Sequence, residues 1–104
     1  MLYRDCRPGG QLFIGDTTLT ALEKQGSTLC FRLDTPERLD IVSGHAYIQH
    51  GGDAGTAYMV KLPADNSVVI RAGRESVAIK SLRKSGAYLR FGVRAPRSIR
   101  IQEK

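Results

Sequence analysis

The sequence predicts an all-β fold, and three observations support that prediction. Apolar and polar residues alternate in short runs, as they do in strands with one buried face. Gly, Pro, Asp and Ser residues interrupt these runs every eight to twelve residues or so, about the spacing of turns in β proteins. Similar runs recur in the two halves of the 104-residue chain. This pattern is typical of a β-meander, barrel or sandwich with little or no helix.

The first half contains four runs with the strand pattern. They occupy residues 11–16, 17–22, 28–33 and 38–42. Turn residues mark the ends of these runs: a Gly-Asp pair at 15–16 closes the first, and Gln-Gly-Ser at 25–27 follows the second. Any helix is confined to residues 45–50. The second half repeats the pattern at residues 67–70, 76–82, 88–93 and 98–101.

The two halves align as an internal repeat. Residues 26–41 match residues 86–101 without a gap, and five identical pairs keep an offset of 60: Gly26 and Gly86, Leu29 and Leu89, Phe31 and Phe91, Pro36 and Pro96, Ile41 and Ile101. Upstream, residues 12–14 match 68–70, and 19–22 match 77–79 after a small length difference. A unit of about fifty residues buries a poor core alone, so two copies are expected to share one.

We therefore expect one compact domain that contains a first repeat at residues 1–49, a linker at 50–57 and a second repeat at 58–104. Net charge divides unevenly between the halves. The chain carries 16 basic and 10 acidic residues, a net charge of +6 with a pI near 9.8. Residues 1–52 have a net charge of −1, whereas residues 53–104 have +7. This asymmetry favours a polyanionic partner, such as nucleic acid, at one face or end.

Catalytic and metal-binding patterns are not found in the sequence. No Ser/His/Asp or Cys/His arrangement indicates a nucleophile, so an enzyme is not expected. His45 and His50 lack partners at ligand spacing, so neither a metal nor another cofactor is expected. Cys6 and Cys30 are interpreted as small buried or half-buried residues, with a disulfide as the minor alternative. The sequence shows neither a secretion signal nor an apolar run long enough to span a membrane, so we expect cytoplasmic localisation without a membrane partner.

The aromatic residues and glycines also have structural interpretations. Phe13, Phe31 and Phe91 alternate within strands and are expected in the core, while Tyr3 and Tyr88 suit either the core or base stacking. Turn or bulge positions, rather than phosphate cradles, are expected for Gly9, Gly10, Gly15 and Gly92.

Two segments carry a family resemblance. Met1–Leu2 is followed by RPGGQLFIGD at residues 7–16, and GAYLRFGVRAPRSIRI fills residues 86–101. In this order they resemble the carbon storage regulator (CsrA/RsmA) family, which begins with Met-Leu. Its members share an Arg-x-Gly-Glu-x-Leu-x-Ile-Gly-Asp segment and a later Gly-x-x-Val-Arg-Ile-Gly-x-x-Ala-Pro-x-x-Val-x-Val strand pair. The resemblance covers nearly the whole chain except the linker.

The resemblance implies a tandem duplication within one chain. Two interlocked five-stranded units would exchange edge strands, so that a monomer forms an intramolecular pseudo-dimer. The family's function implies a bacterial-type translational regulator that binds GGA-containing RNA loops, in a messenger leader or a small RNA. In that family, each RNA site combines the first strand of one unit with the last strand of the other.

The two implied sites have different charges. One would join residues 2–7 to residues 99–104, and the other would join 60–63 to 39–43, where Lys61 faces Glu37, Arg38 and Asp40. A polyanion needs cations, so we expect only the first site to bind RNA. Its expected residues are Arg4, Arg7, Arg97, Ile99, Arg100, Ile101 and Lys104.

Departures from the family pattern leave other interpretations open. The family's arginine beyond the last strand falls on Ser43 and Glu103, and Glu23 and Arg83 replace the first glycine of its Gly-x-x-Gly turn. These changes favour a module that has lost RNA recognition and binds proteins, as a partner or antagonist of a regulator. The edge-strand arginines could also be solvated charges that prevent aggregation. The basic cluster favours RNA.

Overall fold

In the computed structural model, residues 1–36, 40–43, 46–51, 57–72 and 75–103 are described. They contain no helix, which confirms the all-β prediction for this part of the chain. None of these residues belongs to a helix capable of crossing a membrane. The strands are β1 (Leu2–Cys6), β2 (Gln11–Ile14), β3 (Thr17–Gln25), β4 (Thr28–Asp34), β5 (Asp40–Ser43), β6 (Tyr47–Gly51), β7 (Ala57–Leu62), β8 (Ser67–Ala72), β9 (Glu75–Leu82), β10 (Leu89–Arg94) and β11 (Ile101–Glu103).

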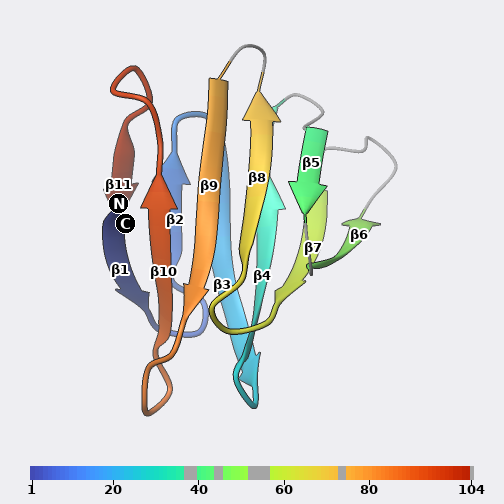
Figure 1. Ribbon diagram of the computed structural model, residues 1–104, viewed down its shortest axis with the longest axis vertical. Helices are drawn as coiled ribbons and strands as arrows, with labels where there is room; N and C mark the ends of the chain where they lie inside the picture. Colours follow the sequence, from blue (N-terminus) through green and yellow to red (C-terminus); the bar gives the residue numbers. More distant parts are fainter. Residues whose placement is uncertain (37–39, 44–45, 52–56, 73–74, 104) are drawn as a thin grey trace.

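The strands form two antiparallel sheets that face each other as a sandwich (Figure 1). Sheet A has the order β1-β10-β9-β8-β5, and sheet B has the order β11-β2-β3-β4-β7-β6. Among the described residues, no strand pair joins the two sheets, so the barrel alternative is wrong and the sandwich alternative is right.

Both sheets combine strands from the two halves of the chain. In sheet A, the second-half strands β8, β9 and β10 lie between β1 and β5 of the first half. In sheet B, the first-half strands β2, β3 and β4 lie between β11 and β7 of the second half, and β6 adds to β7. Neither half therefore completes a sheet with its own strands.

The core lies between the inward faces of the sheets. Phe31 of β4 and Phe91 of β10 are fully buried, and their rings meet edge to face with centroids 5.3 Å apart. Equivalent residues of the two repeats thus touch at the centre of one shared core. Phe13 is only half-buried, so its assignment to the core was wrong. Leu12 and Ile14 take the inward positions of β2, and the alternation of a strand directs Phe13 outward.

The strand register corrects one part of the repeat alignment. Ile14 pairs with Thr17 in the β2–β3 hairpin, and Ile70 pairs with Val77 in the β8–β9 hairpin. Thr17 therefore corresponds to Val77, and Leu19 corresponds to Ile79 rather than to Val77. The offset is 56 for Ile14 and Ile70 but 60 for Thr17 and Val77, so the four additional residues lie in the β8–β9 hairpin.

The turn before each of these hairpins repeats the same geometry. Gly9 has a φ of 88°, and its amide donates to the carbonyl of Ala21 over 2.7 Å. Asp65, 56 positions later, has a φ of 66°, and its amide donates to the carbonyl of Ser81 over 2.8 Å. The turn interpretation is therefore confirmed at Gly9, and the repeat extends to the hydrogen bonds of the loops.

Three sequence-based assignments differ from the structure near the end of each repeat. Residues 45–50, to which the sequence confined any helix, form none in their described part, because Tyr47–Gly51 forms β6 along the edge of β7; residue 45 lies outside the described residues. The strand expected at 98–101 begins only at Ile101, because a turn closed by the Ile99 amide on the Pro96 carbonyl precedes it. Residues 50–51 and 57 of the expected linker belong to β6 and β7.

Candidate nucleic-acid interface

The strands β1 and β11 lie on the same side of the sandwich. β1 is the edge of sheet A, β11 is the edge of sheet B, and both chain ends lie beside them (Figure 1). The Arg4 Nε and Glu103 Oε1 atoms, 2.8 Å apart, join the two strands by an ion pair. The first and last strands expected to form the RNA site are therefore neighbours, although β1 hydrogen-bonds to β10 and β11 to β2.

A groove of about 430 Å³ lies between the start of β1 and the segment that leads into β11. Its apolar lining includes Leu2 and Ile101, together with Met1, Val93 and Ile99. Met1 and Leu2 are each more than 40% exposed. The groove therefore presents apolar surface to solvent beside polar side chains, a combination that suits unstacked nucleic-acid bases.

Exposed arginines border this groove. Arg94 and Arg97 line it, whereas Arg100, which stands between Ile99 and Ile101 in the sequence, lines a neighbouring cavity together with Asp16 and Glu75. No ion pair within the described ranges involves these three arginines. The amide of Gly15 donates to the carbonyl of Arg100 over 2.8 Å, which fixes this segment to the β2–β3 turn. Because Arg94, Arg97 and Arg100 have no ion-pair partner among the described residues, their positive charges are available to a phosphate backbone.

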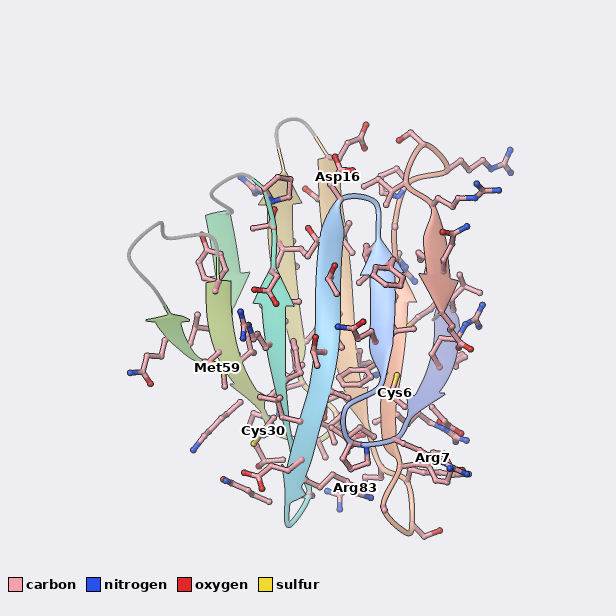
Figure 2. The ribbon with its side chains drawn as sticks, turned by 180° about the vertical axis from the view of Figure 1, so that it is seen from behind. Cys6, Arg7, Asp16, Cys30, Met59 and Arg83 are labelled. Carbon is pink, nitrogen blue, oxygen red and sulfur yellow. The ribbon has the colours of Figure 1, made fainter. Side chains whose placement is uncertain are left out.

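Arg7 lies at the other end of β1. Its Nε donates to the hydroxyl of Tyr88 over 3.1 Å, and its guanidinium lies 5.6 Å from the centre of that ring. Figure 2 shows Arg7 and Asp16 at opposite ends of the molecule, and Asp16 belongs to the turn that contacts Arg100. The structure therefore does not bring Arg7 together with Arg100 or with Arg97, three residues earlier.

The remaining expected residues have mixed outcomes. Arg4, Ile99 and Ile101 lie at the groove or next to it, whereas Lys104 lies outside the described residues. The Glu103 carboxylate neutralises Arg4 and lowers the positive charge at this border. Sequence reasoning missed Arg94, whose position directly before the Ala-Pro dipeptide of the family-like segment was the available signal.

The cysteines are confirmed as buried, free thiols. Burial raises the pKa of Cys6 to about 11, and the nearby carboxylates of Glu103 and Asp5 add to this increase. Burial also raises the pKa of Cys30, although the charge of Lys61 acts in the opposite direction. Thiols with raised pKa values are poor nucleophiles at neutral pH, so neither cysteine adds reactive chemistry.

The opposite side of the sandwich differs in its strand edges. There β5 pairs with β8 in sheet A, while β7 pairs with β4 and β6 in sheet B. β7 corresponds to β1, but β6 covers its outer edge from Gly51 to Tyr47. The expected neighbours of the second site, residues 39–43 and 60–63, belong to different sheets in their described parts, as β1 and β11 do, so the difference between the two sides is the cover of β6 on β7.

The charges on that side differ as well. Asp34 occupies the position that corresponds to Arg94, and it pairs with Arg32 over 2.8 Å. Glu37 and Arg38 lie outside the described residues. The described part of this side therefore has a covered strand edge and an acidic residue where the β1–β11 side has an open edge and an arginine.

Comparison with known proteins gives no match to a protein-family model, to a curated protein or to a solved structure. Within the described part of the chain, no three His, Cys, Asp or Glu side chains converge as metal ligands. The interface is therefore argued from its own geometry and charge.

Proposed function

We propose that this chain is an RNA-binding translational regulator of the carbon storage regulator type, with one RNA site at the groove between β1 and β11. One observation carries the proposal: no described strand pairs with the outer edge of β1, which lies beside exposed arginines, whereas its counterpart β7 is covered by β6. The exchange of outer strands between the repeats further supports kinship with that family.

The groove offers both components of single-stranded RNA recognition. Arg94, Arg97 and Arg100 would bind phosphates, or the edge of a guanine, and release counterions. The apolar surface of Leu2 and Ile101 would contact bases, while unpaired backbone groups along β1 would read the base edges. A GGA loop held in this groove would be inaccessible to the ribosome.

A titration with a GGA hairpin RNA tests this proposal. We expect the protein to bind the GGA hairpin more tightly than a hairpin with a scrambled loop, at one RNA per chain. Arg97→Ala and Arg100→Ala should each weaken binding by about tenfold and reduce its salt dependence, because each removes a phosphate contact. Fluorescence anisotropy at several salt concentrations measures both effects.

Two further variants sharpen the experiment. Lys61→Ala removes an exposed charge from the outer face of sheet B and should change affinity less than twofold or so. Glu103→Gln releases Arg4 from its ion pair and should tighten binding severalfold. Two equal sites per chain, or equal affinity for the scrambled loop together with no effect of the arginine substitutions, would contradict the proposal.

The open edge of β1 also favours a second candidate function. Leu2 and Tyr3 on this strand are 42% and 59% exposed, and an exposed edge of this kind can accept a strand from a partner protein. The chain would then act as a module that binds another protein rather than RNA. Failure of the RNA titration, combined with protection of β1 amides from exchange by a bound protein, would favour this function.

A further inference from the structure

We infer that the outer face of sheet A is a second contact surface for single-stranded nucleic acid, which continues from the β1–β11 groove. The inference rests on the proposed RNA-binding function and extends it to a face that the groove does not include. Arg94 connects the two surfaces, because it lines the groove and also ends the outward-facing series of β10.

The register of sheet A distributes single cations over successive rows of this face. Tyr3, Gly92 and Lys80 are aligned on three adjacent strands, and Asp5 and Arg90 are aligned in the next row. Burial alternates along β8 and β9, and along β10 except at Gly92, which Met1 and Tyr3 cover, so Tyr3, Lys80, Asp5 and Arg90 lie on the face directed away from sheet B. The outward cations on the central strands are Arg71, Lys80, Arg90 and Arg94.

A depression of about 540 Å³ lies on this face beside an exposed tyrosine. Tyr3, Leu82 and Arg90 line it, together with Arg83 and Asp65. Asp65 pairs with Arg83 over 3.2 Å, and Asp5 pairs with Arg90 over 2.7 Å. The depression therefore combines an exposed aromatic ring, an aliphatic side chain and guanidinium groups.

Gly92 leaves space on the outer face of β10 for the side chains of Met1 and Tyr3. A Cβ at Gly92 would lie 2.5 Å from the sulfur of Met1 and 3.5 Å from the ring of Tyr3. The absence of a side chain lets Met1 and Tyr3 lie against β10, and the Tyr3 ring remains 59% exposed. One side of the Tyr3 ring therefore packs against β10 at Gly92, while the rest of the ring is exposed to a stacking partner.

The corresponding face of sheet B is less basic: it carries Arg32 and Lys61, but Arg32 is paired with Asp34. By the register of the two sheets, Lys80 corresponds to Thr20, Arg90 to Cys30, and Arg94 to Asp34. The outer face of sheet A thus has three cations at positions where sheet B has none. General solvation of strand faces does not explain a difference between two faces of the same architecture.

This arrangement suits a single strand more than a duplex or an acidic protein. Exposed aromatic rings stack on unpaired bases, each stack contributing about 1 to 3 kcal/mol by alanine substitution, and a basic surface follows the phosphates. A duplex offers no free base to Tyr3. We therefore assign Tyr3 as a stacking residue, with Lys80 and Arg94 as phosphate contacts, since Asp5 already neutralises Arg90.

A short oligouridylate, which lacks GGA, tests this surface independently of the groove's proposed specificity. Lys80→Glu should weaken its binding by about tenfold, whereas Lys61→Glu on sheet B, with the same change in charge, should change it about twofold or less. Tyr3→Ala should weaken binding about tenfold, while Met59→Ala at the corresponding position of β7 should not. Amide chemical shifts should move at Lys80, Leu82 and Arg90.

The outcomes separate this inference from the proposed function. Equal losses for Lys80→Glu and Lys61→Glu, or no effect of Tyr3→Ala in a variant with a native amide spectrum, would overturn the second surface. Shift changes confined to Ile99 and Ile101 would overturn it as well and leave the groove intact. Oligouridylate binding on sheet A combined with no preference for GGA hairpins would instead overturn only the proposed function.

Discussion

At the scale of single residues, the differences between the repeats show what each position tolerates. Ala21 and Ser81 occupy equivalent buried positions, and both are fully inaccessible to solvent. The backbone of Ser81 is satisfied, since its amide donates to Asn66 over 3.0 Å and its carbonyl accepts from Asp65 over 2.8 Å. Its hydroxyl, however, has no hydrogen-bond partner within the described structure. A buried unpaired hydroxyl destabilises a fold, whereas a methyl group at the same place does not.

Ser81→Ala should therefore stabilise the protein. We expect the free energy of unfolding to rise by about 1 kcal/mol, because the substitution removes an unsatisfied polar atom and leaves the backbone hydrogen bonds in place. Urea unfolding followed by circular dichroism measures the change. The reverse substitution in the other repeat, Ala21→Ser, should lower stability by a similar amount; a destabilised Ser81→Ala would show that the hydroxyl has a partner.

At the scale of elements, the two equivalent turns differ in how tightly they close. The amide of Gly10 donates to the carbonyl of Arg7 over 2.8 Å, whereas Asn66 donates to Pro63 over 3.2 Å. A Cβ at Gly10 would lie 2.9 Å from the carbonyl oxygen of Arg7, a backbone atom that cannot easily move. The looser second turn accommodates the side chain of Asn66. Glycine at position 10 therefore allows the tight turn that leads from β1 to β2.

Gly10→Ala should destabilise the protein by about 1 to 3 kcal/mol through backbone displacement. Gly9→Ala meets no neighbouring atom but forces a methyl group onto a residue with positive φ, so we expect a cost of about 1 kcal/mol. Asn66→Ala is the matched control and should cost less than Gly10→Ala, because its turn already holds a Cβ. Thermal unfolding of the three variants measures this order, and a harmless Gly10→Ala would contradict the steric argument.

At the scale of the whole molecule, strand exchange makes the two repeats depend on each other. Sheet A takes β1 and β5 from the first half, and sheet B takes β7 and β11 from the second. The core then closes through Phe31 and Phe91, one from each half. A half chain would leave its central strands without the outer strands and without the opposing sheet.

A chain divided within residues 52–56 should therefore fold only as a complex. We expect neither half to form a folded monomer, because each would expose the inward faces of its three central strands. An equimolar mixture should give a one-to-one complex with the amide spectrum of the intact chain. Sedimentation and two-dimensional NMR check this outcome, and a well-dispersed spectrum from either half as a monomer would contradict it.

Much of the strand architecture could be predicted locally, because alternation along the chain reports which side chains face a core. Leu29, Phe31 and Leu33 follow this rule, and all three are buried. Phe13 does not follow it, because Leu12 and Ile14 on either side are apolar too. Side chains alternate along a strand, so either Phe13 or its two neighbours can face the core, and in the structure the neighbours do. The strand Tyr47–Gly51 was not predicted, because its hydrogen-bond partner β7 follows it after residues whose pattern shows no hairpin.

The sequence predicted which kinds of residue form the candidate site better than it predicted how those residues lie relative to one another. Its arginines stand out in the uneven charge of the two halves, and the repeat places them near the last strand. The distance between Arg7 and Arg97 was not predictable, because it depends on the direction in which β1 runs along β10. The pairing of Arg4 with Glu103 likewise joins residues from opposite ends of the chain.

The all-β class, the internal repeat and the concentration of positive charge in the second half follow from the order of the residues, because alternation, turn chemistry and charge are local properties. The open edge of β1, the cover of β6 on β7 and the basic outer face of sheet A follow from the folded chain. They arise from pairings between distant strands, and a duplicated sequence does not specify which of two equivalent edges stays free. That choice distinguishes the β1–β11 groove from its covered counterpart.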